Sequence, residues 1–256
     1  MEVSLLGFRS EYHFDDQIQY VDYSTRELQE TLTPQQVLHI LKDGHERFRT
    51  GRRLTRDFGR QVRATAKEQH PLAVVLSCID SRTPAELIFD LGLGDIFSIR
   101  IAGNVASREV LASAEYGCAV AGAKVILVLG HTRCGAVSTA IKLLCSTQTA
   151  AEATGCQHLD HIVHVLQQSI DPVVCEHIDA RSAEEQESLV TAVARRNVSR
   201  MVRRIREQSR ILDGLVRERR IAIVGALYDV VTGEIEFLAE NGLDHLLPPE
   251  LVRPGE

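Results

Sequence analysis

Short apolar runs alternate along the centre of the chain with longer stretches in which apolar residues recur every three or four positions. Four of the runs are apolar almost throughout, which predicts strands buried on both faces, at residues 72–77, 96–101, 125–130 and 221–228. A fifth run, residues 235–238, follows the turn Thr232-Gly233. We expect it to form an antiparallel strand at the edge of the same sheet.

The stretches between these runs have the helical period. Thr33, Pro34 and Gln36 form a helix start, since Thr can cap, Pro suits the first helical position and Gln can complete a capping box. That helix should end near Thr50, and further helices are expected over residues 60–69, 84–89, 107–120, 136–144 and 184–218. The alternation predicts an α/β fold: a mostly parallel central sheet of four strands plus an antiparallel edge strand, flanked by helices.

Two segments depart from this alternation. Residues 1–32 carry five scattered aromatic side chains, and we interpret them as an N-terminal helical arm that docks on its own domain or on a second subunit. Residues 146–182 form a helix-containing excursion rich in polar and small residues. Because no repeat or long polar linker divides the remainder, we expect one arm, 1–32, and one domain, 33–256.

Composition narrows the class of protein. Of the 256 residues, 44% are hydrophobic and 25% charged, as in soluble globular proteins, which argues against collagen-like, coiled-coil or wholly disordered chains. A net charge of -6 argues against a broad nucleic-acid surface, and Glu residues flank the Arg-rich stretch 195–210, which we interpret as a salt-bridged helix face or a subunit contact. No run has the roughly 18 residues that span a bilayer, and no secretory pattern opens the chain, so a cytoplasmic location is expected.

Two short motifs follow the first and third predicted strands. The first contains Cys78, Asp80 and Arg82, and the second contains His131 and Cys134. Since the carboxyl ends of parallel strands share one edge of a sheet, the fold should bring the two motifs together. Two thiolates and one imidazole suit zinc and leave a fourth position open, as at catalytic zinc sites. Asp80 could take that position or hold a water there, and Arg82 could draw the carboxylate off the metal.

The other cysteines and a histidine cluster were weighed as well. Without a secretory signal, we expect reduced thiols in place of a disulfide framework, and we interpret Cys118, Cys145 and Cys175 as buried or inert. His158, His161 and His164 raise the alternative of a second metal site, but their spacing matches no established ligand pattern. We expect a solvated face there.

Together the motifs Cys-x-Asp-x-Arg and His-x-x-Cys resemble those of the β-class carbonic anhydrases, zinc lyases that interconvert carbon dioxide and bicarbonate, and the likeness extends from about Thr33 to Gly242. The resemblance implies that Zn²⁺ is bound by Cys78, His131 and Cys134. It implies catalytic roles for Asp80 and Arg82. Substrate-binding roles follow by the same resemblance for Gln69, Phe97, Ala102, Tyr116 and the backbone of Gly135.

The resemblance also implies a mechanism and partners. Hydroxide formed on the zinc would attack carbon dioxide, and the subunits would form a homodimer or a dimer of dimers. Some family members hold an inhibitory bicarbonate with a Trp three residues before the first Cys; Val75 stands there, so we expect an open resting site with Asp80 held by Arg82. The closest likeness is to anhydrases fused to, or found beside, SulP-type bicarbonate transporters, which implies such an association at the cytoplasmic face of a membrane.

Two other functions stay open at this point. One is a hydrolase of carbon disulfide or carbonyl sulfide on the same scaffold. The other is a non-catalytic bicarbonate-sensing or transporter-regulating module. Asp80, Arg82 and Gln69 argue against the module, because a purely structural zinc site does not need an oriented water.

Overall fold

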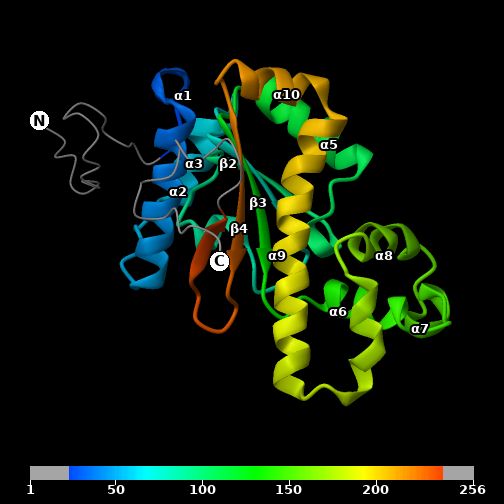
Figure 1. The fold of residues 1–256 in the computed structure, drawn as a ribbon. Coiled ribbons are helices and arrows are strands. Elements are labelled where there is room, and N and C mark those ends of the chain that lie inside the picture. Colours follow the sequence, from blue (N-terminus) through cyan, green and yellow to red (C-terminus); the bar gives the residue numbers. More distant parts are fainter. Residues whose placement is uncertain (1–22, 239–256) are drawn as a thin grey trace, which may run out of the picture.

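A five-stranded sheet forms the centre of the computed structural model, which describes residues 23–238 (Figure 1). Its strands are β1 (Ala73–Ser77), β2 (Ile96–Arg100), β3 (Val125–His131), β4 (Ala222–Tyr228) and β5 (Ile235–Leu238), in the order β2-β1-β3-β4-β5. The first four are parallel, and β5 pairs antiparallel with β4. Every residue of β1, β3 and β4 is buried, whereas β2 lies at the edge and is partly exposed. The predicted fold class is confirmed.

Helices cover both faces of the sheet (Figure 1). On one face α2 (Pro34–Arg49) and α4 (Ala85–Ile88) contribute to one apolar core. The other face has a larger core, to which five helices contribute: α5 (Arg108–Glu115), α6 (Gly135–Leu144), α8 (Asp160–Gln167), α9 (Ala183–Gln208) and α10 (Arg210–Arg217). The sheet is therefore the middle layer of three.

The helix start at Thr33 is confirmed. The Thr33 side chain accepts a hydrogen bond from the Gln36 amide, and the Gln36 side chain accepts one from the Thr33 amide at 2.9 Å. Just before it, α1 (Arg26–Thr31) is fastened to the domain, because Gln29 Nε2 donates to the carbonyls of Pro71 and Ala121. The described end of the predicted arm thus docks on its own domain; the aromatic residues Phe8, Tyr12, Phe14 and Tyr20 lie outside the described residues.

Three expected helices differ in detail. The stretch predicted over residues 184–218 is interrupted at Ser209, a buried residue that ends α9 and caps α10 through a hydrogen bond from the Leu212 amide. Its hydroxyl also donates to Glu115 Oε1 at 2.6 Å. The stretch predicted over residues 107–120 ends in a π-turn, η3 (Tyr116–Val120). The helix expected near residue 60, α3 (Phe58–Thr65), ends four residues earlier than predicted.

The excursion contains α7 (Ala150–Thr154), α8 and a 3₁₀ segment, η4 (Pro172–Ala180). Cys145, at the end of α6, forms a disulfide with Cys175 of η4, 30 residues further on. The interpretation of these two residues as free thiols is therefore wrong. It was based on the expected redox compartment, whereas the disulfide forms because η4 lies beside the end of α6. Cys118 is a free, buried thiol, as expected. No helix in the described part of the chain is both long and apolar enough to span a bilayer.

Candidate metal centre

Three metal-ligating side chains meet at the carboxyl edge of the sheet. Cys78 follows β1 directly, and His131 is the last residue of the neighbouring strand β3. Cys134 lies one short turn further on. The ligand atoms of all three lie within 4.8 Å of one another and all three residues are buried. Within residues 23–238 this is the one group of three or more such residues. The two predicted motifs are therefore brought together as expected.

The turn after β3 aims Cys134 back toward His131. Arg133 has a φ of 55°, a left-handed conformation that reverses the chain sharply. Thr132 is fixed on both sides, since its amide donates to the Tyr228 carbonyl and its hydroxyl accepts from the Val230 amide. Helix α6 begins directly after Cys134. The positive end of the helix dipole then favours a thiolate at this position.

His131 is oriented in the way that metal-binding histidines usually are. Its Nδ1 lies 2.9 Å from the Thr132 carbonyl oxygen, so a proton on Nδ1 is donated there. That tautomer leaves the lone pair on Nε2, which is buried and has no hydrogen-bond partner among the described residues. A buried acceptor without a partner costs free energy unless a ligand satisfies it. The donor set of two thiols and one imidazole therefore fits zinc.

The two sulfurs influence each other strongly. A hydrogen bond from Cys134 to Cys78 lowers the pKa of Cys78 to about 4, and the Gly103 amide donates to the same sulfur at 3.4 Å. The contact with Cys78, together with burial, raises the pKa of Cys134. A divalent cation would hold both as thiolates, and its binding would release a proton.

Asp80 lies beside the ligand group and is held out of it. Arg82 binds the carboxylate in a fork, with Nε 2.9 Å from Oδ1 and Nη2 2.8 Å from Oδ2, and the Arg82 amide also donates to Oδ1. These hydrogen bonds lower the pKa of Asp80 to about 2. Asp80 Oδ2 is 4.0 Å from His131 Nε2. The expected pairing of Asp80 with Arg82 is confirmed.

Arg100 supports the same turn, although no role for it was derived from the sequence. Its Nε donates to the Cys78 carbonyl at 3.1 Å and its Nη2 to the Asp80 carbonyl at 2.6 Å. Arg100 is the last residue of β2, and β2 is the neighbour of β1. The sequence signal was thus a long cation at the end of the adjacent strand. It could be used only once the strand order was known.

Two of the predicted substrate-binding residues adjoin the ligands. Ala102 begins η2 (Ala102–Asn104), whose Gly103 contacts the Cys78 sulfur. Gly135 is the first residue of α6 and is exposed. Its amide, like those of any first helical turn, has no acceptor within the helix. Both positions can therefore face a ligand bound at the three side chains.

Gln69, Phe97 and Tyr116 lie elsewhere in the chain. Gln69 is exposed and precedes β1, whereas Cys78 follows it. Five strand residues at about 3.3 Å each separate the two ends by about 16 Å. The rings of Phe97 and Tyr116 have centroids 6.5 Å apart and line an open groove of about 480 Å³ along β2 and α5. A single copy of the chain does not bring these three side chains to the metal ligands.

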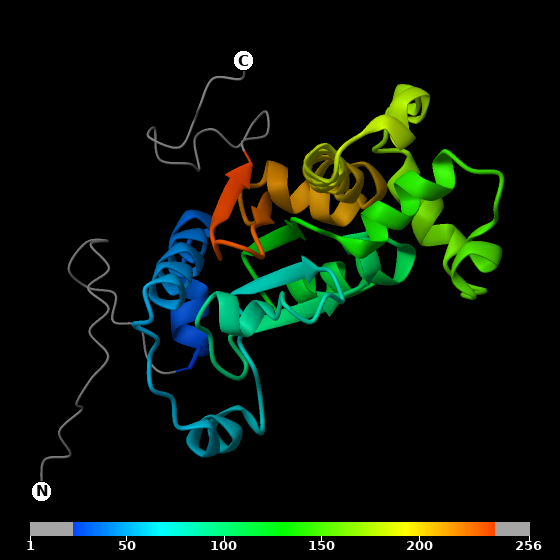
Figure 2. The same ribbon diagram turned by 90° about the horizontal axis from the view of Figure 1, so that it is seen from below.

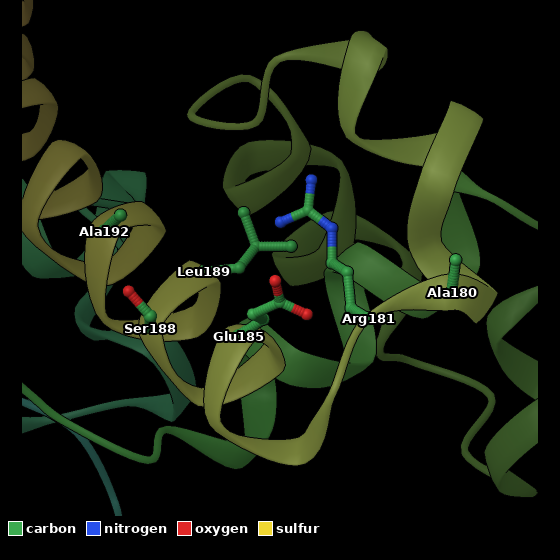
Figure 3. Close-up of a pocket in the computed structure, with 6 residues that line it drawn as sticks. All are labelled: Ala180, Arg181, Glu185, Ser188, Leu189 and Ala192. Carbon is green, nitrogen blue, oxygen red and sulfur yellow. The ribbon is translucent and has the colours of Figure 1, made fainter.

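Another open pocket, of about 590 Å³, lies between the end of η4 and the first turns of α9 (Figure 3). Figure 3 shows Arg181, Glu185 and Leu189 around it. The Glu185 carboxylate accepts a hydrogen bond from the Ser182 amide as part of a capping box, which gives it a structural role. The residues that line this pocket include no Cys or His. It is therefore not the candidate centre.

The comparisons with known proteins agree with this geometry. The carbonic anhydrase family model matches residues 73–235, which include all three candidate ligands. The chain belongs to the carbonic anhydrase family. A carbonic anhydrase of Pseudomonas aeruginosa is 30% identical over 182 residues, 69% of this chain and 77% of that protein. One from Mycolicibacterium smegmatis is 47% identical over 105 residues, 41% of this chain and 51% of the relative. The chain thus matches about half the length of this mycobacterial relative.

Solved structures place the chain in the β class of that family. The β-carbonic anhydrase CafA of Aspergillus fumigatus superposes with a TM-score of 0.57 at 25% identity, covering 75% of this chain and 84% of CafA. A β-carbonic anhydrase of Sordaria macrospora, one of two described as tetrameric, has a TM-score of 0.58 at 24% identity, covering 71% of this chain and 91% of its own. The chain therefore has the fold of the β-carbonic anhydrases.

Proposed function

We propose that the protein catalyses the zinc-dependent, reversible hydration of carbon dioxide to bicarbonate and a proton. The carrying observation is the buried group Cys78, His131 and Cys134, whose ligand atoms lie within 4.8 Å of one another. Beside it, Arg82 keeps the Asp80 carboxylate available without placing it in the group. Three protein ligands with a fourth position free are typical of catalytic zinc sites. Membership in the carbonic anhydrase family supplies the reaction.

Zinc bound here would act as a Lewis acid and would lower the pKa of a water molecule toward neutral pH. Asp80, ionised because Arg82 lowers its pKa to about 2, accepts a hydrogen bond from the reacting water and so orients the water oxygen toward the substrate. The Gly135 amide donates to a substrate oxygen at the start of α6, where the helix dipole also favours a bicarbonate anion. Ala102 forms part of an apolar wall suited to carbon dioxide.

We propose further that the working enzyme is a homodimer or a dimer of dimers, in which Gln69, Phe97 and Tyr116 complete the site of a second copy. Three observations support this. β2 is a sheet edge, and the groove beside it exposes 58% of Tyr116. Helix α3 stands off from the sheet in Figure 2 and exposes Phe58 and Val62 by more than half. Apolar surface of this kind is typical of subunit contacts. Gln69 would bind the substrate oxygen beside the partner's metal.

Mixed subunits test this arrangement. Cys78→Ala removes a metal ligand but keeps Gln69, while Gln69→Ala keeps all three ligands. If Gln69 acts on the second copy, co-refolding the two inactive variants restores one complete site per mixed dimer. The measurement is carbon dioxide hydration of the mixture against each variant alone, together with the solution mass of the wild type. A monomeric wild type, or no recovery from mixed dimers, would contradict the arrangement.

Stopped-flow hydration of carbon dioxide by zinc-loaded protein tests the activity itself. We expect Cys78→Ala to abolish turnover, and Asp80→Asn to lower kcat about 100-fold because a neutral amide loses the charged pairing with Arg82 and no longer orients the reacting water. Glu207→Gln, an exposed carboxylate on α9, is the matched control and should leave kcat unchanged. A folded, zinc-bound protein without turnover at any pH would overturn the proposal. Carbon disulfide, carbonyl sulfide and bicarbonate binding would then be assayed.

Three further parts of the assignment rest on the sequence alone. We propose that residues 33–256 form the catalytic domain and residues 1–32 an arm. We also propose a cytoplasmic site of action beside, or as part of, a SulP-type bicarbonate transporter. The support for a transporter is the likeness of the aromatic arm and of residues 154–158 to transporter-associated anhydrases. Co-purification of the native protein with such a transporter from detergent-solubilised membranes tests this association.

A further inference from the structure

The sulfur of Cys78 receives a backbone hydrogen bond from Gly103, a residue in a left-handed conformation. The Gly103 amide donates to Cys78 Sγ at 3.4 Å. Gly103 has a φ of 66° inside the short η2 turn, and its neighbour Asn104 has a φ of 45°. Glycine adopts this left-handed region freely, so the conformation alone does not fix the residue. The question is which neighbours hold Gly103 in place.

Asn197 holds it from the side of helix α9. Its side chain is completely buried, and its Nδ2 donates to the Gly103 carbonyl at 3.0 Å. Its Oδ1 accepts a hydrogen bond from the hydroxyl of Ser169, which follows α8, at 3.4 Å. A fully buried amide on a long helix is costly unless both of its ends are bonded. Because α9 packs on β3 and β4, this amide has a rigid base.

Leu166 of α8 also holds Gly103, by packing against it. A Cβ built on Gly103 would lie 2.8 Å from Leu166 Cδ1, so the leucine is in direct contact with the glycine backbone and leaves no room for a side chain. Asn197 thus fixes the Gly103 carbonyl while Leu166 limits the movement of the residue as a whole. The excursion, through α8, therefore contributes to the surroundings of a metal ligand.

We propose that Asn197 is a positioning residue: by binding the Gly103 carbonyl it fixes this residue, so that the Gly103 amide, in the preceding peptide unit, stays on Cys78 Sγ and reduces the negative charge this sulfur donates to the metal. The inference rests on the proposed zinc site. Two thiolates donate more charge than imidazoles and make a bound zinc a weaker Lewis acid. A hydrogen bond to a thiolate opposes that effect, and partners of this kind, one step removed from the metal, tune metal sites.

Cobalt-substituted protein tests the proposal, since the energy of sulfur-to-cobalt charge transfer reports the charge on the thiolates. Asn197→Leu keeps the volume of the side chain and removes its donor. We expect the charge-transfer band to move to lower energy, and kcat/KM of the zinc form to fall about 10-fold to 100-fold. Val202→Ala is the matched control, because Val202 is buried on the same helix but packs beside Gly225 of β4. It should lower stability and leave the band in place.

The outcomes separate this inference from the proposed function. A wild type that binds no stoichiometric cobalt would overturn the metal site itself. If the wild type binds cobalt and a folded Asn197→Leu shows an unmoved band and unchanged kcat/KM, the positioning role alone is wrong. Should Asn197→Leu fail to fold, Leu166→Ala and Ser169→Ala take its place, with smaller shifts expected in the same direction. The absence of a shift in both would equally overturn the role.

Discussion

The two ends of helix α6 each carry a cysteine, and the two cysteines have different chemistry. Cys134 directly precedes the helix and Cys145 directly follows it. Each meets a second cysteine from a distant segment. At the start of the helix the partner is Cys78 and both sulfurs stay free, while at the end the partner is Cys175 and a disulfide forms.

The difference lies in what the fold places around each pair. At the start of α6 the helix dipole favours negative charge, and the sulfurs have His131 and the Gly103 amide as neighbours. A thiolate is stabilised there, which suits a metal. At the end of α6 the dipole disfavours a thiolate, and the chain closes the excursion covalently. Residue type alone therefore does not determine the role of a cysteine; its helix terminus and its neighbours do.

Removing the cysteine at each end of α6 in turn should give the largest difference in zinc content and activity. Cys134→Ala removes a ligand, and we expect loss of zinc and of all measurable carbon dioxide hydration. Cys145→Ala, eleven positions along the same helix, should keep stoichiometric zinc. Metal analysis of the two purified proteins beside stopped-flow assays makes the comparison. Zinc retained by Cys134→Ala, or lost from Cys145→Ala, would remove the distinction drawn between the two ends.

Removing the disulfide at the end of α6 should lower the stability of the protein and leave carbon dioxide hydration intact. Closing a loop of about 30 residues restricts the unfolded chain, so Cys145→Ser with Cys175→Ser should lower the free energy of unfolding by about 3 to 4 kcal/mol. Urea denaturation of the zinc-loaded proteins measures it. The same loss should appear when wild-type protein is reduced, and the reduced double variant serves as the control. Equal midpoints for oxidised and reduced wild type would contradict the expectation.

Cys118 sharpens the comparison as a buried sulfur that is in neither pair. Burial raises its pKa to about 12, in contrast to Cys78. Since an unfolded thiol titrates near 8.5, the folded state binds the extra proton between the two values, and stability should fall there as pH rises, by at most about 1.4 kcal/mol per pH unit. The measurement is urea denaturation from pH 8 to 10, with Cys118→Ala as the reference. Parallel pH curves for the two proteins would argue against it.

Much of this fold could be predicted because its signals are local. Runs such as Val125–Leu129 are apolar throughout, and the capping box at Thr33 marks a helix start within four residues. The break at Ser209 was missed because the helical pattern continues through it. What ends α9 there is a buried hydroxyl bonded to Glu115, a contact across 94 positions. The spacing of apolar residues along the chain does not report such a long-range contact.

The candidate site divides in the same way. Cys78, Asp80, His131 and Cys134 stand in two compact motifs, each after a predicted parallel strand, and the shared carboxyl edge of such strands was enough to join them. The roles of Arg100 and Asn197 could not be predicted, since each donates to a backbone carbonyl that any residue type could present. The pairing of Cys145 with Cys175 depended on the path of the excursion. Long-range contacts to the backbone and the return of a loop are properties of the assembled fold.

The strand order also has a consequence for how the protein folds. Cys78 and His131 lie at the ends of β1 and β3, which are neighbours in the sheet but are separated along the chain by β2 and four helical segments, α4, η2, α5 and η3. Of the three candidate ligands, an unfolded chain offers only His131 and Cys134 at close spacing, so Cys78 joins them when parallel pairing is complete. Non-local pairing of this kind is slow to form. Tight metal uptake during refolding should therefore be a late event that reports the pairing of β1 with β3.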